Sequence, residues 1–110
     1  MASLKEDFNM YVISIKRITD YSLEHKPLKE PEWEYLGFDK YSGSFSSGYP
    51  DWMGIHHCEK RDTLEEIMDL WKKVSKSGTN ICINDPKNYD MSSLAIRKVS
   101  FKPVKKLSFQ

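Results

Sequence analysis

The segment that decides the fold is TLEEIMDLWKKVSKSG, which covers residues 63–78. Its apolar side chains recur at intervals of three and four residues, the spacing that places them on one face of an α-helix. Thr63 and Glu66 have the T-x-x-E spacing of a capping box, and Gly78 stands where a C-terminal cap belongs. The pattern predicts a helix over about residues 63–76. Its buried face is expected to carry Leu64, Ile67, Met68, Trp71 and Val74.

The sequence on both sides of this helix contains short segments rich in β-branched and aromatic residues, which favour strands. The predicted strands cover residues 10–17, 32–38, 53–58, 80–84 and 94–101. Residues 3–18 also have apolar side chains at helical spacing, so helix and strand both stay open for this first segment. Near Gly37 the apolar side of the second strand changes, which indicates a β-bulge.

The resulting element order, β-β-β-α-β-β, predicts the α+β class. Hairpin connections join most of the strands, so we expect a small antiparallel sheet of about five strands with the 63–76 helix packed on one face. The length of 110 residues fits a single domain with one hydrophobic core. Residues 1–9, as a lead-in, and residues 103–110, as a basic tail, are expected to lie at its periphery.

Composition indicates a folded protein of the cytoplasm. Apolar residues make up 39% of the chain and aromatic residues 13%, which is enough side-chain volume for a core. Cys58 and Cys82 do not make a disulfide framework in a chain that can build such a core. Residues 1–7 lack the features of a secretory signal, and no apolar run approaches the ~20 residues that span a bilayer. We therefore expect no contact with a membrane.

The charge is distributed unevenly along the chain. Residues 1–90 carry 12 basic and 16 acidic side chains, a net charge of −4, whereas the last twenty residues carry 5 basic side chains and no acid. A basic terminus can contact a nucleic acid, an acidic protein surface or an anionic membrane. Alternatively, its lysines belong to a solvated edge strand and prevent pairing between sheets. The candidate nucleic-acid-binding residues are Arg97, Lys98, Lys102, Lys105 and Lys106.

The segment YSGSFSSGYPDW, residues 41–52, is predicted to be a loop that binds a partner protein. Aromatic rings supply a large contact area at a small cost in side-chain entropy, and Ser and Gly supply adaptable hydrogen bonding. The candidate partner-binding residues are Tyr41, Phe45, Tyr49 and Trp52. Alternatively, the last three of these rings fold back and cap the core. Both readings can hold for different rings.

The residues that could carry chemistry are concentrated at His56, His57 and Cys58. Neighbouring residues on a strand point to alternating faces, so these three cannot converge on one metal ion. A catalytic Cys–His pair also needs residues from separate elements. We therefore expect no catalytic residue, no metal ion and no cofactor. A small metal-binding or Cys/His enzyme domain built on these residues is the least favoured alternative.

Three stretches of the chain resemble small accessory proteins encoded by bacteriophages: Met10 to Ile13, Gly48 to Trp52, and Lys60 to Glu66. In that group a Gly-Tyr-Pro-aromatic segment is followed by a helix that begins with Thr-Leu-Glu-Glu. Members with a known role often bind a host protein and inhibit or redirect it. The resemblance implies a non-enzymatic effector that acts on a protein in the host cytoplasm. The alternative is a nucleic-acid-associated protein that uses residues 97–106.

Overall fold

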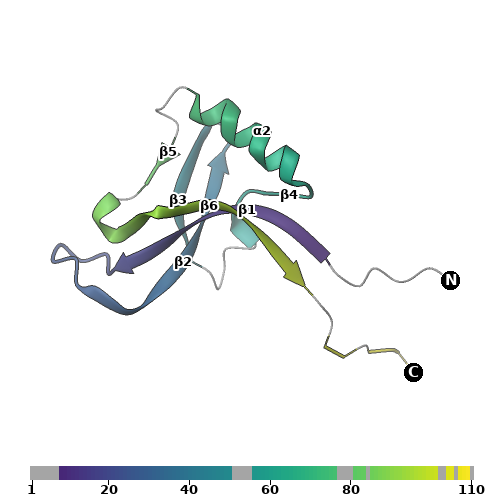
Figure 1. Ribbon diagram of the computed structural model, residues 1–110, viewed down its shortest axis with the longest axis horizontal. Coiled ribbons are helices and arrows are strands. Elements are labelled where there is room, and N and C mark those ends of the chain that lie inside the picture. Colours follow the sequence, from purple (N-terminus) through teal and green to yellow (C-terminus); the bar gives the residue numbers. More distant parts are fainter. Residues whose placement is uncertain are drawn as a thin grey trace.

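The computed structural model describes residues 8–50, 56–76, 81–83, 85–101, 104–105 and 107–109. An α-helix packs against a six-stranded sheet (Figure 1). The strands are β1 (Phe8–Thr19), β2 (Pro27–Asp39), β3 (Ser44–Pro50), β4 (Lys60–Arg61), β5 (Ile81–Cys82) and β6 (Tyr89–Phe101). The helix is α2 (Leu64–Ser75), and a short 3-10 turn, η1 (Pro86–Asn88), precedes β6. The expected α+β class is confirmed.

Strand β1 is the centre of the sheet. One of its edges pairs with β6 from Phe8 to Arg17, and its other edge pairs with β2 and, closer to the start of the strand, with β4. Strand β3 extends the sheet beyond β2, and β5 lies beside β3. The four long strands pair antiparallel, as predicted. The short β5 pairs with β3 in parallel.

Helix α2 begins where the capping box predicts. The Thr63 hydroxyl oxygen accepts a hydrogen bond from the backbone N–H of Glu66 (3.2 Å), and the hydroxyl donates to the Glu66 carboxylate (2.8 Å). Ile67 and Val74 are buried in the core, but Trp71 is only partly buried and Leu64 is 45% exposed. The buried face is therefore narrower than predicted, because Leu64 at the start of the helix lies outside the core cluster. The predicted cap at Gly78 falls outside the described residues.

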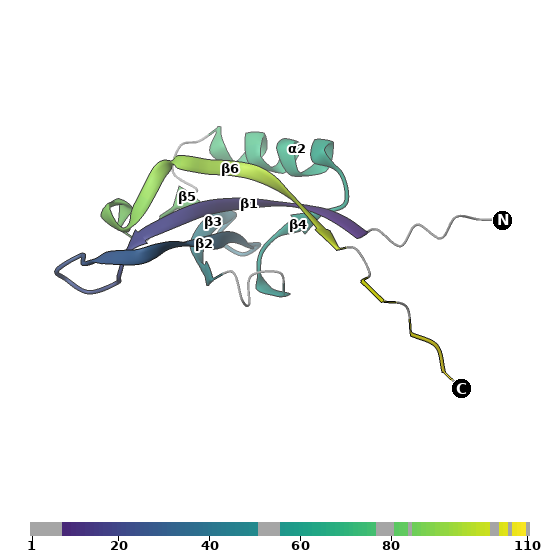
Figure 2. The ribbon, with the colours of Figure 1, turned by 60° about the horizontal axis from the view of Figure 1, so that its bottom comes forward.

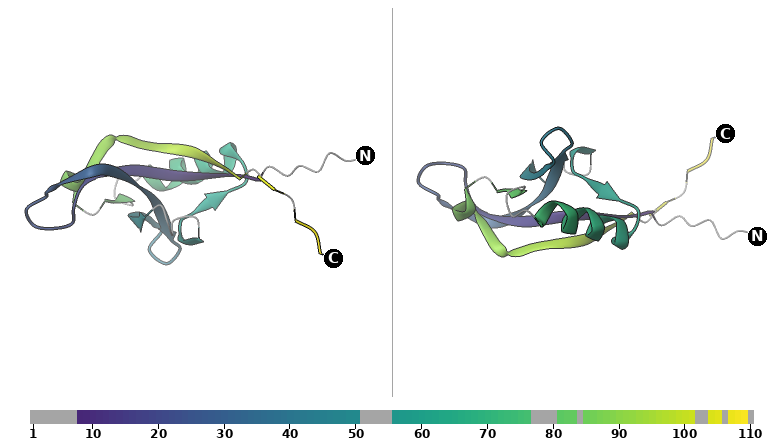
Figure 3. Two further views of the ribbon diagram at one scale, coloured as in Figure 1. Left: turned by 90° about the horizontal axis from the view of Figure 1, so that it is seen from below. Right: turned by 90° about the horizontal axis from the view of Figure 1, so that it is seen from above.

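The sheet has two faces because successive side chains of each strand alternate in direction. We call the side toward α2 the helix face and the opposite side the far face. Figures 2 and 3 show α2 on one side only of β1 and β6. The core on the helix face is made by Ile13, Ile15, Leu36, Phe45, Ile67, Val74 and Tyr89. Val12, Ser14 and Lys16 point to the far face, where Val12 and Ser14 are fully buried.

The positions of several strands differ from the prediction. Strand β3 occupies residues 44–50, which were predicted to be loop, and β2 begins at Pro27 rather than at residue 32. His56 and His57 form a helical turn in place of the strand predicted over residues 53–58, of which residues 53–55 fall outside the described residues. A Ser- and Gly-rich segment forms a strand here because a neighbouring strand supplies backbone hydrogen-bond partners, which local propensity does not register.

Two further expectations about the strands are resolved. The first segment is a strand from Phe8 onward, so its helical spacing does not produce a helix in the part that the structure describes. The pairing of β2 with β3 shifts register between Tyr35 and Gly37, which confirms the predicted β-bulge. Among the described residues, no helix is long and apolar enough to cross a membrane.

Candidate functional site

The turn between β2 and β3 holds Tyr41 outside the fold. Tyr41 is fully exposed, and its backbone N–H donates a hydrogen bond to the Asp39 carboxylate (2.9 Å). The N–H of Gly43 donates to the carbonyl of Asp39 (2.7 Å), and Gly43 has a φ of +67°, which glycine adopts without strain. The hydrogen bond from Tyr41 also lowers the pKa of Asp39. The turn is thus stabilised by backbone groups and the Asp39 side chain, independently of the Tyr41 ring.

A pocket of about 340 Å³ adjoins this turn. Its lining residues are Phe38, Gly43, Leu70, Lys73 and Val74. The β2–β3 hairpin therefore supplies one wall and the C-terminal half of α2 the other, and Figure 1 shows these two elements close together. We call Tyr41 and the pocket residues the hairpin site. It offers an apolar cavity with a lysine in its wall and an exposed aromatic ring beside it.

The other residues predicted in the partner-binding loop do not join Tyr41. Phe45 is fully buried, with its ring centre 5.1 Å from that of Phe38 and 5.6 Å from that of Trp71. The prediction that Phe45 binds a partner is therefore wrong, because β3 directs this side chain toward α2. Tyr49 lies in β3 opposite Tyr35. The side chain of Tyr49 and the whole of Trp52 fall outside the described residues.

A second cluster lies on the far face, where Arg97 of β6 meets Trp33 of β2. The guanidinium carbon of Arg97 lies 4.0 Å from the centre of the Trp33 ring, and Nζ of Lys16 lies 5.3 Å from it. Lys16 is paired with Trp33 in register, and Arg97 is paired with Val12 of the same face. We call Lys16, Trp33 and Arg97 the far-face cluster. The sequence analysis missed Trp33, although the alternation in residues 32–35 already separates the aromatic from the acidic side chains.

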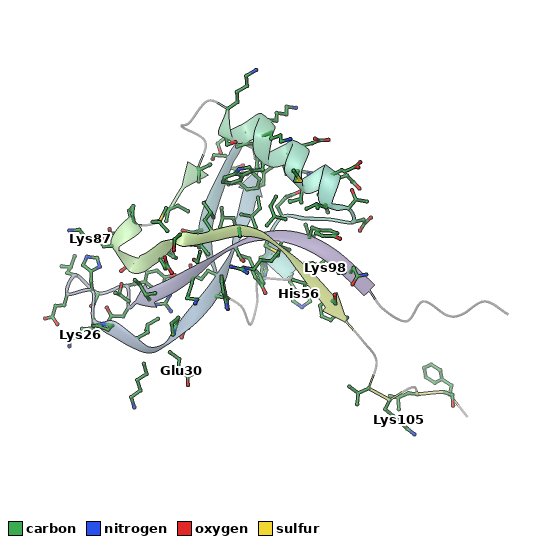
Figure 4. All side chains as sticks on the ribbon, in the orientation of Figure 1. Lys26, Glu30, His56, Lys87, Lys98 and Lys105 are labelled. Atoms are coloured by element: carbon green, nitrogen blue, oxygen red, sulfur yellow. The ribbon has the colours of Figure 1, made fainter. Side chains whose placement is uncertain are left out.

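The remaining basic residues predicted at the C-terminal end lie elsewhere. Lys98 is opposite Tyr11 and so points to the helix face, on which it is exposed. Lys105 is exposed on a segment that leads away from the sheet (Figure 4). Lys102 and Lys106 fall outside the described residues. Of the five residues predicted to bind nucleic acid, the structure thus brings Arg97 next to an aromatic ring and separates Lys98 and Lys105 from it.

A buried polar network lies on the helix face beyond α2. Its centre is the carboxylate of Glu34, which is 1% exposed and accepts hydrogen bonds from the hydroxyls of Tyr89 (2.7 Å) and Tyr21. Arg17 Nε lies 2.8 Å from the same carboxylate, as an ion pair rather than an aligned hydrogen bond. Arg17 also pairs with Glu32. Burial raises the pKa of both tyrosine hydroxyls. The network satisfies its charges internally.

His25 connects the β1–β2 turn to the 3-10 turn η1. One ring nitrogen, Nδ1, lies 2.8 Å from Oδ1 of Asn88, and the other, Nε2, lies 3.3 Å from the Asp85 carboxylate. Figure 4 shows Lys26 and Lys87, the neighbours of these residues, at the same end of the molecule. The side-chain contacts of His25 therefore stabilise the connection between two turns.

The residues that could carry chemistry do not converge. His56 and His57 are exposed, whereas Cys58 is buried and burial raises the pKa of its thiol. A thiol with a raised pKa is mostly protonated at neutral pH and is a poor nucleophile. In the part of the chain that the structure describes, no group of three or more His, Cys, Asp and Glu side chains could hold a metal ion.

Among the described residues, the hairpin site and the far-face cluster are thus two candidate sites, and they lie on opposite sides of the sheet. The first combines an apolar pocket with Tyr41, and the second combines two cations with Trp33. No protein-family model matches the chain, and comparisons with curated proteins and with solved structures found no match.

Proposed function

We propose that this protein is a non-enzymatic binding protein that engages a partner protein through the hairpin site. The observation that carries the proposal is the full exposure of Tyr41 on a turn that is held by its own hydrogen bonds. An aromatic side chain presented by a rigid turn buries a large area on binding and loses little conformational freedom. Such residues dominate the binding energy of many interfaces.

The pocket beside Tyr41 indicates the chemistry of the partner surface that would bind there. Its apolar lining from Phe38, Leu70 and Val74 accommodates an apolar side chain of the partner. Lys73 in the wall and Lys40 in the turn, both exposed, favour a carboxylate next to that side chain. The partner surface is therefore an apolar projection flanked by acidic residues, with Tyr41 packing against its outer side.

We propose no catalytic activity, because the acid–base side chains that cluster on the helix face are buried or hydrogen-bonded to one another. Glu34, Tyr21 and Tyr89 form a cluster of titratable side chains on the helix face, and Glu34 is 1% exposed. A substrate could reach this carboxylate only if the tyrosine hydroxyls moved away. Burial of Cys58 likewise disfavours its use as a nucleophile.

The resemblance to bacteriophage accessory proteins supports a host protein as the partner. Inhibition or redirection of that host protein is the proposed outcome. Tyr49 and Trp52 belong to the segment that carries the resemblance, and they remain predicted partner-binding residues. Phe45 does not, because it is a core residue.

The proposal is tested by comparing two alanine variants of exposed residues at opposite ends of β2. Tyr41→Ala removes the proposed anchor, and Leu23→Ala removes a side chain that is 99% exposed in the β1–β2 turn. The tagged full chain and both variants are used to capture proteins from a nuclease-treated bacterial lysate. A protein captured by the unmodified chain is then titrated with each variant. We expect Tyr41→Ala to weaken binding by about 2 kcal/mol or more, and Leu23→Ala to leave it unchanged.

Thermal unfolding provides the control, since both variants should keep the stability of the unmodified chain to within about 0.5 kcal/mol. Lys73→Glu should also weaken binding, because it reverses the charge of the pocket wall. Normal binding by Tyr41→Ala, or an equal loss with Leu23→Ala, would show that the partner binds elsewhere.

A further inference from the structure

Two kinds of basic side chain occur on the sheet. Arg17 is paired with Glu32 and Glu34, and Arg61 is paired with Glu59. Among the residues that the structure describes, neither Lys16 nor Arg97 forms an ion pair with a carboxylate. Asp90 lies opposite Lys16 in register, but its carboxylate accepts hydrogen bonds from the backbone and side chain of Ser92. The two far-face cations are thus available to an anion from outside.

Arg97 is held in place for such a contact. Its guanidinium group lies over the Trp33 ring, and its Nη2 donates a hydrogen bond to the carbonyl of Ser93 (3.2 Å). A guanidinium group has five N–H donors in a fixed plane. These contacts therefore orient the group and leave other N–H donors available to an anion. Arg97 is exposed on the surface. An anion would therefore meet a cation whose position is already fixed.

Aromatic and basic side chains share the far face with Arg97. Trp33 and Tyr35 point to the far face, since their register partners are Lys16 and Ser14. Residues two apart on a strand are separated by about 6–7 Å, so the two rings follow one another along β2. Lys60 of β4 is also opposite Val12, on the edge away from Arg97. The far face thus carries rings bordered by cations.

We propose that this face binds single-stranded nucleic acid, with phosphates contacting Lys16 and Arg97 and a base stacking on the Arg97–Trp33 pair. Proteins that bind single strands combine basic grooves with aromatic stacking platforms. An unpaired strand fits better than a duplex because its bases are free to stack on a side chain. An acidic protein would neutralise the cations but would give the ring no planar partner.

The experiment measures binding of a fluorescein-labelled 15-nucleotide oligo(dT) to the full chain by fluorescence anisotropy, at salt concentrations from 50 to 200 mM. Each phosphate contact contributes roughly 0.7 to the slope of log affinity against log salt for a single strand. The double variant Lys16→Gln/Arg97→Gln should therefore reduce the magnitude of the slope by about 1.4. Trp33→Ala should weaken binding about five-fold or more, and Trp33→Phe should restore most of the loss.

The matched control is Lys72→Gln/Lys76→Gln, which removes the same charge from exposed positions of α2 and the residue that follows it. This control should keep the salt slope of the unmodified chain. Tyr41→Ala should also bind the oligonucleotide normally, which separates this site from the hairpin site. If Trp33→Ala does not fold, the salt slope of the double variant and the behaviour of Trp33→Phe decide the outcome.

Four results would overturn the proposal. They are no binding at 50 mM salt, an equal loss of slope in the α2 control, binding of a duplex as tight as that of the single strand, and binding of poly-glutamate as tight as that of oligo(dT). The third result would exclude base stacking. The fourth would assign the far face to an acidic protein instead.

Discussion

Arg17 and Arg97 lie on opposite faces of the same sheet and use the same chemical group differently. Arg17 is on the helix face, where Glu32 and Glu34 neutralise it and its guanidinium carbon lies 4.3 Å from the centre of the Tyr21 ring. Arg97 is on the far face, where it lies over Trp33 and has no ion-pair partner among the described residues. The first is part of the folded structure, and the second is presented to solvent. An arginine whose charge is neutralised within the protein stabilises the fold, whereas an exposed arginine without an ion-pair partner can bind a ligand.

The aromatic residues of the hairpin divide in the same way. Tyr41 and Phe45 are four residues apart, but Tyr41 is fully exposed and Phe45 is fully buried. Local composition does not distinguish them, because both are aromatic residues in a Ser- and Gly-rich segment. Their roles are decided by the strand that begins at Ser44 and directs Phe45 toward α2. Each comparison predicts a larger loss of stability when the buried member is replaced than when the exposed member is replaced.

The largest effect is expected for Phe45→Ala. This change removes a fully buried ring that contacts Phe38 and Trp71, and it should lower the free energy of unfolding by about 3–5 kcal/mol. Chemical denaturation followed by circular dichroism measures the difference. The matching change, Tyr41→Ala, should cost no more than about 0.5 kcal/mol. Similar losses for the two variants would mean that the turn and the core are not separated as the structure has them.

The next effect concerns the two arginines. Arg17→Met leaves Glu34 buried without its cation, and we expect the free energy of unfolding to fall by about 3 kcal/mol. This value is at the lower end for a broken buried ion pair, because both tyrosine hydrogen bonds to Glu34 remain. Arg97→Met should cost about 1 kcal/mol or less, the usual size of an exposed cation–π contact. Both free energies of unfolding come from urea titrations at neutral pH. A larger loss for Arg97→Met than for Arg17→Met would reverse the comparison.

The smallest effect is a pH dependence that arises on the helix face. Burial raises the pKa of Tyr89 and of Tyr21 above the unfolded value near 10.0. Above pH 10 the unfolded chain has lost tyrosine protons that the folded chain keeps, so the free energy of unfolding falls as pH rises. Below pH 10 both states keep these protons, and the stabilisation from the two tyrosines is fully present. The slope is at most about 1.4 kcal/mol per pH unit for each tyrosine. Tyr89 should dominate, because Tyr21 is half exposed and water screens it.

Melting temperatures between pH 9 and pH 11 measure this slope. Tyr89→Phe should flatten it, and Tyr41→Phe, which changes a fully exposed ring, should not. The slope is the informative quantity, since Tyr89→Phe also removes a hydrogen bond to Glu34 and lowers stability at every pH. An unchanged slope in Tyr89→Phe would mean that other tyrosines cause the alkaline loss.

Local sequence signals predicted the elements whose interactions are local. The capping box of Thr63 and Glu66 fixed the start of α2. β-Branched and aromatic residues indicated β1 and the second half of β2, although not the start of β2 at Pro27. The change of apolar side near Gly37 located the bulge. Each of these depends on residues within a few positions of one another, which is why composition and spacing were sufficient.

The sequence by itself determined the fold class, the helix and the candidate status of Tyr41 and Arg97. Tertiary structure alone decided that Ser44–Pro50 is a strand, that Phe45 is a core residue, and that Arg97 lies over Trp33, 64 positions away in the chain. It also placed Glu34 between Tyr21, Tyr89 and Arg17. The physical reason is that strand pairing and side-chain burial depend on partners from distant parts of the chain, and their register is fixed only when the whole sheet assembles.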